Sequence, residues 1–167
     1  MGLTTVHIAF GGNLGEVRDT FIQARYALNQ NDAINVLKSS KLYRTPPLGP
    51  PGQPDYLNAV IAIETALEPL QLLDLLQHIE VQHGRERGER WGPRTLDLDI
   101  IDFDNRIVNT DRLTLPHPHL HERMFVLCPL CDIALSWQHP LLQASAQQLM
   151  KQLLEQGETP LPPGERW

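Results

Sequence analysis

Cysteine is scarce in this sequence, since Cys128 and Cys131 are the only two among 167 residues. Two cysteines cannot form the disulfide framework of a small secreted domain. The chain also lacks an apolar run near the roughly 20 residues that cross a bilayer, and it lacks the charged and apolar regions of a signal peptide. These absences predict a cytoplasmic protein that has no membrane partner.

A surplus of basic residues is missing as well. The chain has 14 Lys and Arg against 20 Asp and Glu, which gives a formal net charge of −6. Binding to duplex nucleic acid depends on a broad basic surface, so we expect no nucleic-acid partner. The length, with 41% hydrophobic and 20% charged residues, is typical of one globular domain, and we expect a monomer.

The spacing of apolar residues predicts alternating strands and helices. We expect strands at 6–10, 34–43, 59–63, 96–100 and 106–109, and helices at 16–28, 69–83, 124–135 and 145–154. This order predicts an α+β fold, a ferredoxin-like sandwich whose mainly antiparallel sheet is covered by helices. Residues 1–158 would form a single domain, and the proline-rich residues 159–167 an irregular tail.

The most informative stretch is the strand that begins after Thr95. Apolar and acidic residues alternate in it, so Leu96, Leu98 and Ile100 can face the core while Asp97 and Asp99 project together from the other face. Neighbouring carboxylates repel each other unless a cation or a proton intervenes, and hard divalent cations prefer oxygen ligands. The pair therefore indicates a metal site, although two solvated residues on an exposed sheet face would give the same pattern.

Four arginines precede this strand and accompany Trp91: Arg85, Arg87, Arg90 and Arg94. The planar guanidinium suits phosphate oxygens and stays charged near neutral pH. A polyphosphate with its metal would fit a site of this composition. The alternative is a solvated turn in which Glu86 and Glu89 partly balance the arginines.

Other motifs allow two interpretations each. The glycines at 11–15 lack the lysine and the spacing of phosphate-binding loops, so a plain turn is favoured. Asn58 could cap a proline-rich loop or pair with a ligand, whereas Gln77 and Glu80 are favoured as solvated helix residues. The histidines at 117, 119 and 121 and the two cysteines could form a zinc site, but core packing of the cysteines is favoured. His117, which lies between two prolines, could donate a hydrogen bond to a phosphate.

Several segments together closely resemble the 6-hydroxymethyl-7,8-dihydropterin pyrophosphokinases of folate biosynthesis. The segments that carry the resemblance, in chain order, are I-A-F-G at 8–11, Y-R-T-P-P-L-G at 43–49, Q-P-D-Y-L-N-A at 53–59, R-W-G-P-R-T-L-D-L-D-I at 90–100, L-P-H-P at 115–118 and R-M-F-V-L at 123–127. The residue patterns alone leave open the possibility that the chain is a regulatory or ligand-binding domain without catalytic activity. The resemblance implies an enzyme.

The resemblance implies transfer of pyrophosphate from ATP to the pterin hydroxymethyl group, with AMP released and two Mg²⁺ ions held by Asp97 and Asp99. Arg85 and Arg94 would join this pair in catalysis. The nucleotide would be contacted by Gln77, Glu80, Arg85, Arg87, Trp91, Arg94, Ile100, Arg112, Thr114, His117 and Arg123. The pterin would be contacted by Gly11, Thr45, Pro46, Leu48, Tyr56, Asn58, Trp91 and Phe125.

Overall fold

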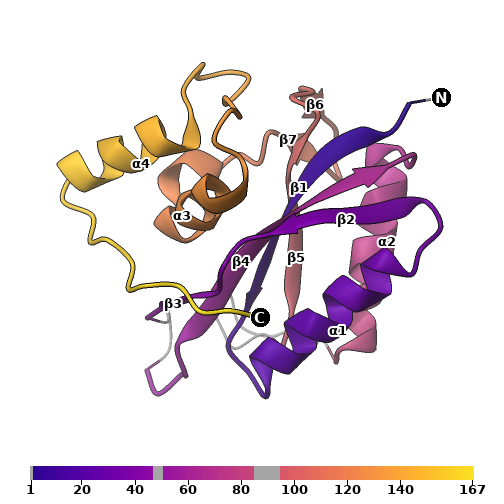
Figure 1. Ribbon diagram of the computed structural model, residues 1–167, viewed down its shortest axis with the longest axis horizontal. Helices are drawn as coiled ribbons and strands as arrows, with labels where there is room; N and C mark the ends of the chain where they lie inside the picture. The colour runs from indigo at the N-terminus through magenta and orange to yellow at the C-terminus, as the bar shows by residue number, and fades with distance from the viewer. Residues whose placement is uncertain (1, 47–50, 85–94) are drawn as a thin grey trace.

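A five-stranded antiparallel sheet forms the centre of the computed structural model, which describes residues 2–46, 51–84 and 95–167 (Figure 1). Its strands are β1 (Thr4–Gly12), β2 (Ile34–Ser39), β3 (Tyr43–Thr45), β4 (Tyr56–Thr65) and β5 (Asp97–Phe103). Their order is β2-β4-β1-β5, and β3 pairs with β4 beyond the end of β2. The short strands β6 (Val108–Asn109) and β7 (Thr114–Leu115) form a separate two-stranded sheet.

Helices cover both faces of this sheet. α1 (Val17–Asn29) and α2 (Pro69–Gln82) lie on one face, and α3 (Met124–Ile133) and α4 (Ala146–Glu155) lie on the other, preceded by the 3₁₀ turn η1 (Leu120–Glu122) (Figure 1). The order from β1 to β5, with α1 and α2 each joining two strands, is the ferredoxin-like pattern. The predicted α+β sandwich is confirmed.

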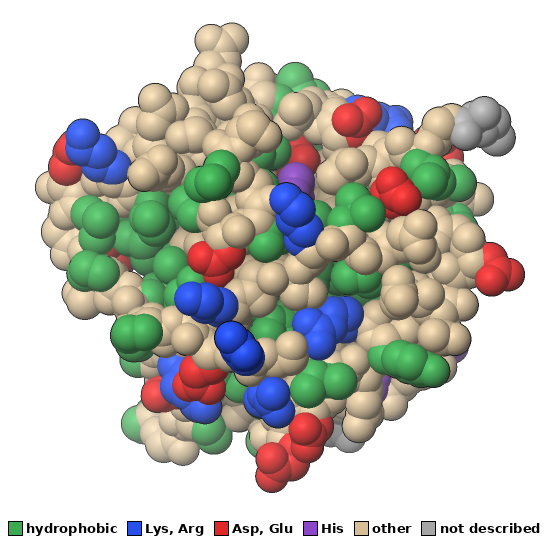
Figure 2. Space-filling view, in the orientation of Figure 1, with side chains coloured by type: hydrophobic (Ala, Val, Ile, Leu, Met, Phe, Trp, Pro, Cys, Tyr) green, Lys and Arg blue, Asp and Glu red, His purple; other side chains and the backbone are tan. Residues whose placement is uncertain are grey.

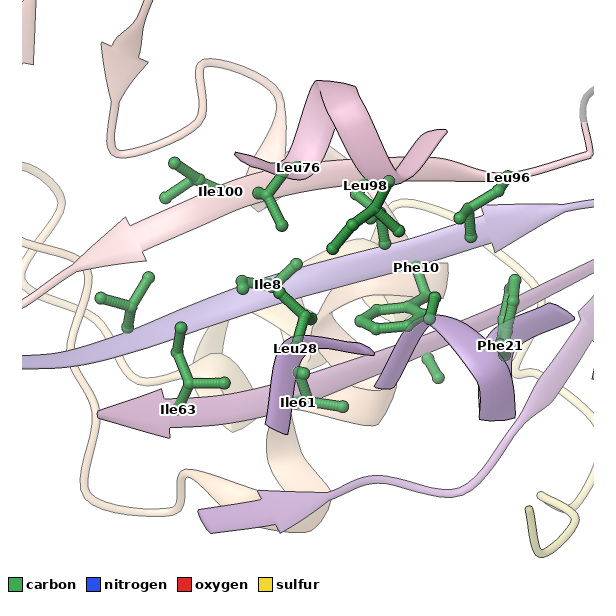
Figure 3. Close-up of a cluster of buried hydrophobic side chains, with 14 of the residues drawn as sticks. Ile8, Phe10, Phe21, Leu28, Ile61, Ile63, Leu76, Leu96, Leu98 and Ile100 are labelled. Carbon is green, nitrogen blue, oxygen red and sulfur yellow. The ribbon is translucent and has the colours of Figure 1, made fainter. Parts of the chain in front are cut away.

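The larger core lies between the sheet and the first two helices, where alternate residues of the three longest strands meet (Figure 3). Ile8 and Phe10 from β1 pack beside Ile61 from β4 and Leu98 from β5. Because successive strand side chains point to opposite faces, this packing turns the intervening residues of β1, β4 and β5 toward the second face.

A smaller core forms on the second face. Val60 of β4 and Ile101 of β5 pack there against Leu127 and Leu130 of α3. Next to this core, toward one end of the sheet, the same face carries Gly11, Asn58 and Asp97 in three adjacent strands. These residues form the floor of the candidate site.

Two predicted strands differ from the observed ones. The strand expected at 34–43 is divided, because the Ser40 hydroxyl accepts a hydrogen bond from the Val60 amide (2.9 Å) and donates one to the Lys41 carbonyl oxygen (2.8 Å). Side-chain hydrogen bonds thus interrupt the ladder between β2 and β3. The strand expected at 106–109 is shorter than predicted, because the observed strand β6 consists of Val108 and Asn109, which pair with β7.

The C-terminal residues are packed although they form neither a helix nor a named strand. Leu161 packs against the second core and Trp167 against the first, so the chain end crosses from one face of the sheet to the other. The division into a domain of residues 1–158 and a tail stays a prediction. No helix within the described ranges is long and apolar enough to cross a membrane.

Candidate active site

Asp97 and Asp99 project from the same face of β5, as the alternating pattern predicted. Leu98 between them is buried, whereas Asp97 is half-buried and Asp99 is exposed. Their partners across β1 are Gly11 and Ala9, which have no side chain or only a methyl group. The small neighbours leave room in front of the two carboxylates. Mg²⁺ is commonly held by one or two carboxylates together with substrate phosphates, so this donor set fits the ion.

Two contacts fix the outer edge of β5 on either side of Asp99. The buried Glu80 carboxylate of α2 accepts a hydrogen bond from the Leu98 amide (2.8 Å). The His117 amide donates to the Ile101 carbonyl oxygen (3.0 Å). Glu80 is only 4% exposed, so the interpretation of this residue as a solvated helix position is wrong. It is a buried carboxylate that holds β5, the strand with the predicted metal ligands.

A cavity of about 370 Å³ opens beside Asp99, between β5, α2 and the segment from 111 to 118. It is lined by six of the residues expected around the nucleotide: Gln77, Glu80, Ile100, Arg112, Thr114 and His117. The Arg112 guanidinium is held there by Asp74 (2.6 Å) and Gln77 (3.3 Å). Residues from three separate parts of the sequence are therefore brought to one cavity that adjoins a predicted metal ligand.

His117 is neutral in this environment. Burial, the Arg123 guanidinium and His119 lower the pKa of His117 to about 4. Its Nδ1 accepts a hydrogen bond from the His119 amide (3.1 Å), which leaves the proton of the neutral ring on Nε2. His117 can therefore donate a hydrogen bond from Nε2 without carrying a charge.

A second group of predicted residues lies across the sheet from the carboxylates. Gly11 pairs with Asp97 on one side and with Asn58 on the other, so Asp97 and Asn58 are two strands, about 10 Å, apart. A Cβ atom at Gly11 would lie 3.6 Å from Asn58 Oδ1, so the Asn58 carboxamide borders the same open strip. The glycine makes a flat floor between the two polar side chains.

The Asn58 carboxamide has a defined orientation. Its Nδ2 donates to the Thr45 hydroxyl (3.0 Å), which directs Oδ1 toward Gly11. Asn58 is 5% exposed and makes this bond to β3, so its position is fixed within the sheet. The half-buried Tyr56 lies opposite Thr45, and Pro46 follows as an exposed residue.

Arg123 and Phe125 flank the site from the start of α3. The Arg123 guanidinium carbon lies 5.7 Å from the centre of the Phe125 ring, and the ring itself is half-buried. Arg123 also acts electrostatically on His117. The start of α3 thus brings a cation near this cavity and presents an aromatic surface.

Five predicted site residues lie outside the described residues: Leu48, Arg85, Arg87, Trp91 and Arg94. Within the ranges that are described, no group of three or more His, Cys, Asp or Glu side chains could hold a metal. Cys131 packs beside the second core, and burial raises the pKa of its thiol to about 11. Core packing, the favoured interpretation of the cysteines, therefore accounts for Cys131.

One connection at this end of the sheet was missed from the sequence. The buried Asn13 donates from Nδ2 to the Gln53 side chain and to the Pro54 carbonyl oxygen, both at 3.1 Å. It thereby ties the turn after β1 to the proline-rich loop before β4. The only sequence signal was an asparagine next to glycine, which predicted no more than a turn.

Residues 7–135 match the model of the family described as 7,8-dihydro-6-hydroxymethylpterin-pyrophosphokinase (HPPK). A relative from Haemophilus influenzae, a 2-amino-4-hydroxy-6-hydroxymethyldihydropteridine pyrophosphokinase, is 48% identical over 132 residues, which are 79% of this chain and 82% of the relative. This chain belongs to the HPPK family. Members of the family are diphosphotransferases, so the protein is an enzyme of this class.

Two other HPPK relatives are parts of longer proteins. A folic acid synthesis protein of Pneumocystis carinii is 39% identical over 158 residues, which are 95% of this chain but 21% of that protein. The crystal structure of Plasmodium falciparum HPPK-DHPS with pteroate matches with a TM-score of 0.74 at 13% identity, over 93% of this chain and 43% of that one. The chain therefore matches less than half the length of each of these two proteins, and the structural match supports the fold.

Proposed function

We propose that this HPPK family member transfers the terminal diphosphoryl group of ATP to the hydroxymethyl oxygen of 6-hydroxymethyl-7,8-dihydropterin. The hydroxymethyl oxygen forms a bond to the β-phosphorus of ATP, and the bond between that phosphorus and the oxygen bridging it to the α-phosphate breaks. AMP leaves with the bridging oxygen, and the hydroxyl proton is released. The products are AMP and the pterin diphosphate of folate biosynthesis.

One observation carries this proposal: the Asp97 and Asp99 pair lies between the two groups of predicted residues. The cavity with Gln77, Arg112 and His117 adjoins Asp99 on one side. The strip with Gly11 and Asn58 adjoins Asp97 on the other. A nucleotide in the cavity and a planar pterin over the strip would meet at the two carboxylates. Alignment of the two reactants in this way supplies much of what phosphoryl transfer requires.

The residues around the nucleotide cavity suit a triphosphate. The Arg123 cation and the neutral Nε2 donor of His117 would bind phosphate oxygens, and charge-assisted hydrogen bonds of this kind are among the stronger ones. Arg112, oriented by Asp74 and Gln77, would border the nucleoside end. The apolar side chains of Leu73, Leu98 and Leu113 would give an adenine ring a surface with little water.

On the pterin side, Asn58 Oδ1 would accept a hydrogen bond from the amino or ring N–H groups of the ligand. Thr45 would keep the carboxamide in this orientation, because its hydroxyl accepts from Nδ2. Tyr56 and Phe125 would border the ring plane, since aromatic faces pack well on flat heterocycles. Gly11 would let the ring approach the backbone.

Asp97 and Asp99 would hold two Mg²⁺ ions. The ions would offset the charge of the phosphates and orient the β-phosphate for attack. The chain's own contribution is to fix the two carboxylates, which it does through the core packing of Leu98 and the hydrogen bond from Leu98 to Glu80. Ordered carboxylates lower the reorganisation needed when the charged substrate binds.

The nucleotide product tests the proposal. The protein would be incubated with ATP, Mg²⁺ and 6-hydroxymethyl-7,8-dihydropterin, and the nucleotides and pterins separated by anion exchange. We expect AMP and pterin diphosphate in equal amounts and no AMP when the pterin is omitted. Formation of ADP or pyrophosphate instead, or no turnover of either substrate, would overturn the proposal.

A further inference from the structure

The C-terminal residues make backbone hydrogen bonds to Leu42, the residue directly before β3. The Leu42 amide donates to the Glu165 carbonyl oxygen, and the Glu165 amide donates to the Leu42 carbonyl oxygen, both at 2.8 Å. The Arg44 guanidinium adds two bonds to the Glu165 carboxylate (2.8 and 3.2 Å). The chain end thus pairs with Leu42 directly before β3 and bonds to Arg44 within it, while β3 itself pairs with β4. Figure 1 shows this segment passing from α4 by β3 toward α1.

Trp167 anchors the segment in the larger core. Its ring makes edge contacts with Phe10 and Phe21, with centroids 5.5 and 5.8 Å away. The Arg25 guanidinium lies 3.9 Å from the ring centre, and the indole N–H donates to the Ser40 carbonyl oxygen. Lys and Arg side chains gather on this face of the molecule (Figure 2). A half-buried indole with these contacts holds the chain end in one place.

The segment between Ser40 and Arg44 is packed between the chain end and α3. A Cβ atom at Gly164 would lie only 2.5 Å from Lys41 Cβ and 3.0 Å from Tyr43 Cζ, so the chain end packs directly on these side chains. The Tyr43 hydroxyl donates to Asp132 of α3 (2.7 Å), which also accepts from the Lys41 amide (3.2 Å). The approach to β3 is therefore fixed between α3 and the C-terminal residues.

β3 ends at Thr45, whose hydroxyl orients the Asn58 carboxamide. A shift of β3 would move the Thr45 hydroxyl away from Asn58 Nδ2 and free the carboxamide to rotate. We propose that residues 161–167 act as a clamp on β3 and that Trp167 is a positioning residue for pterin binding. This inference rests on the proposed pterin site, and it extends beyond the family match, which ends at residue 135.

The test compares Trp167→Ala, Trp167→Phe and the control Leu153→Ala. Leu153 is 7% exposed on α4 and belongs to the second core, whereas Trp167 packs against the first, so truncation of Leu153 lowers stability at a different place. Calorimetry would measure pterin binding to protein saturated with α,β-methylene-ATP and Mg²⁺, and binding of that nucleotide alone. We expect Trp167→Ala to weaken pterin binding about ten-fold and nucleotide binding hardly at all, with partial rescue by Trp167→Phe. Leu153→Ala should bind both as the wild type does.

Wild-type pterin affinity in folded Trp167→Ala, or equal losses for pterin and nucleotide, would overturn the clamp. A second readout separates this result from failure of the proposed function. Trp167→Ala should speed hydrogen exchange of the Leu42 amide and shift the NMR signals of the Asn58 carboxamide. If the wild type binds no pterin, the proposed function fails. In that case the clamp would be overturned as well if Trp167→Ala left the hydrogen exchange of the Leu42 amide and the NMR signals of the Asn58 carboxamide unchanged.

Discussion

At the scale of single residues, the site depends on side chains whose neighbours determine what they can do. Asn58 could have been a loop cap or a ligand contact, and the sequence favoured neither. The structure shows how Asn58 is oriented. The Thr45 hydroxyl accepts a hydrogen bond from Nδ2, and Oδ1 faces Gly11. His117 is similar, because the His119 amide occupies Nδ1 and determines which nitrogen can donate. The periodicity of apolar residues in the sequence does not show which residues will be the hydrogen-bond partners of such side chains.

The pH response of His117 follows from its lowered pKa. A pKa of about 4 in the folded chain, against about 6.5 when unfolded, means that the unfolded state binds a proton first as the pH falls. The lowered pKa of His117 therefore has no effect on the free energy of unfolding above about pH 6.5. As the pH falls from about 6.5 toward 4, it lowers this free energy by about 1–2 kcal/mol after allowance for partial exposure. His117→Gln should lose stability less steeply over this range, measured by urea unfolding at several pH values.

Proton NMR provides the direct check on this prediction. The His117 ring should titrate near pH 4 in the free protein, and a bound triphosphate should raise this pKa because the negative phosphates favour the charged ring. A His117 ring that titrates near 6.5, together with an unchanged pH slope in His117→Gln, would contradict this account.

Among the elements, β5 carries the two proposed metal ligands and is supported along its outer edge. β5 pairs with β1 on one side, and Glu80 reaches the Leu98 amide from α2 on the other. Helix periodicity could place Glu80 on α2 but could not show that this part of the helix faces a strand edge. The burial of a carboxylate is costly unless it is hydrogen-bonded, which is why the sequence alone favours a solvated Glu80.

Two replacements of Glu80 distinguish the effect of its hydrogen bond to the Leu98 amide from the effect of its side-chain packing. Glu80→Gln keeps an oxygen acceptor for the Leu98 amide, whereas Glu80→Leu leaves that amide without this partner. We expect Glu80→Leu to lose about 1–3 kcal/mol of stability and to slow AMP formation at a temperature where it stays folded. Glu80→Gln should be affected less in both measurements, by urea unfolding and by turnover. Equal stability and equal rates for the two variants would show that the hydrogen bond has no such role.

Much of the element order could be predicted from the sequence, because long apolar periodicities dominate it. The alternation at 96–100 placed Leu96, Leu98 and Ile100 in the core, and the spacing at 69–83 predicted the helix observed as α2. The break between β2 and β3 could not be predicted, since it depends on a bond between Ser40 and Val60, which lie 20 residues apart. The proline-rich C-terminal residues predicted an irregular tail but gave no indication that Trp167 reaches the core.

At the scale of the whole molecule, the two faces of the sheet have different tasks. The face toward α1 and α2 is a continuous core that fixes the strand positions (Figure 3). The other face is covered by α3 and α4 around Val60 and Ile101, while Gly11, Asn58 and Asp97 lie at its far end. The packed core thus holds Asn58 and Asp97 in register on either side of Gly11. The C-terminal residues tie both faces together around β3.

If Asp97 and Asp99 join the two proposed substrate sites, AMP formation should fall sharply in Asp97→Asn and in Asp99→Asn. Asp104→Asn is a matched control, because Asp104 follows the far end of β5 and its left-handed backbone (φ 51°) tolerates asparagine. With ATP, Mg²⁺ and the pterin, we expect each site variant to lose at least about 10³-fold in rate while it remains folded, and the control to match the wild type. A folded Asp97→Asn or Asp99→Asn enzyme that forms AMP at the wild-type rate would contradict the account.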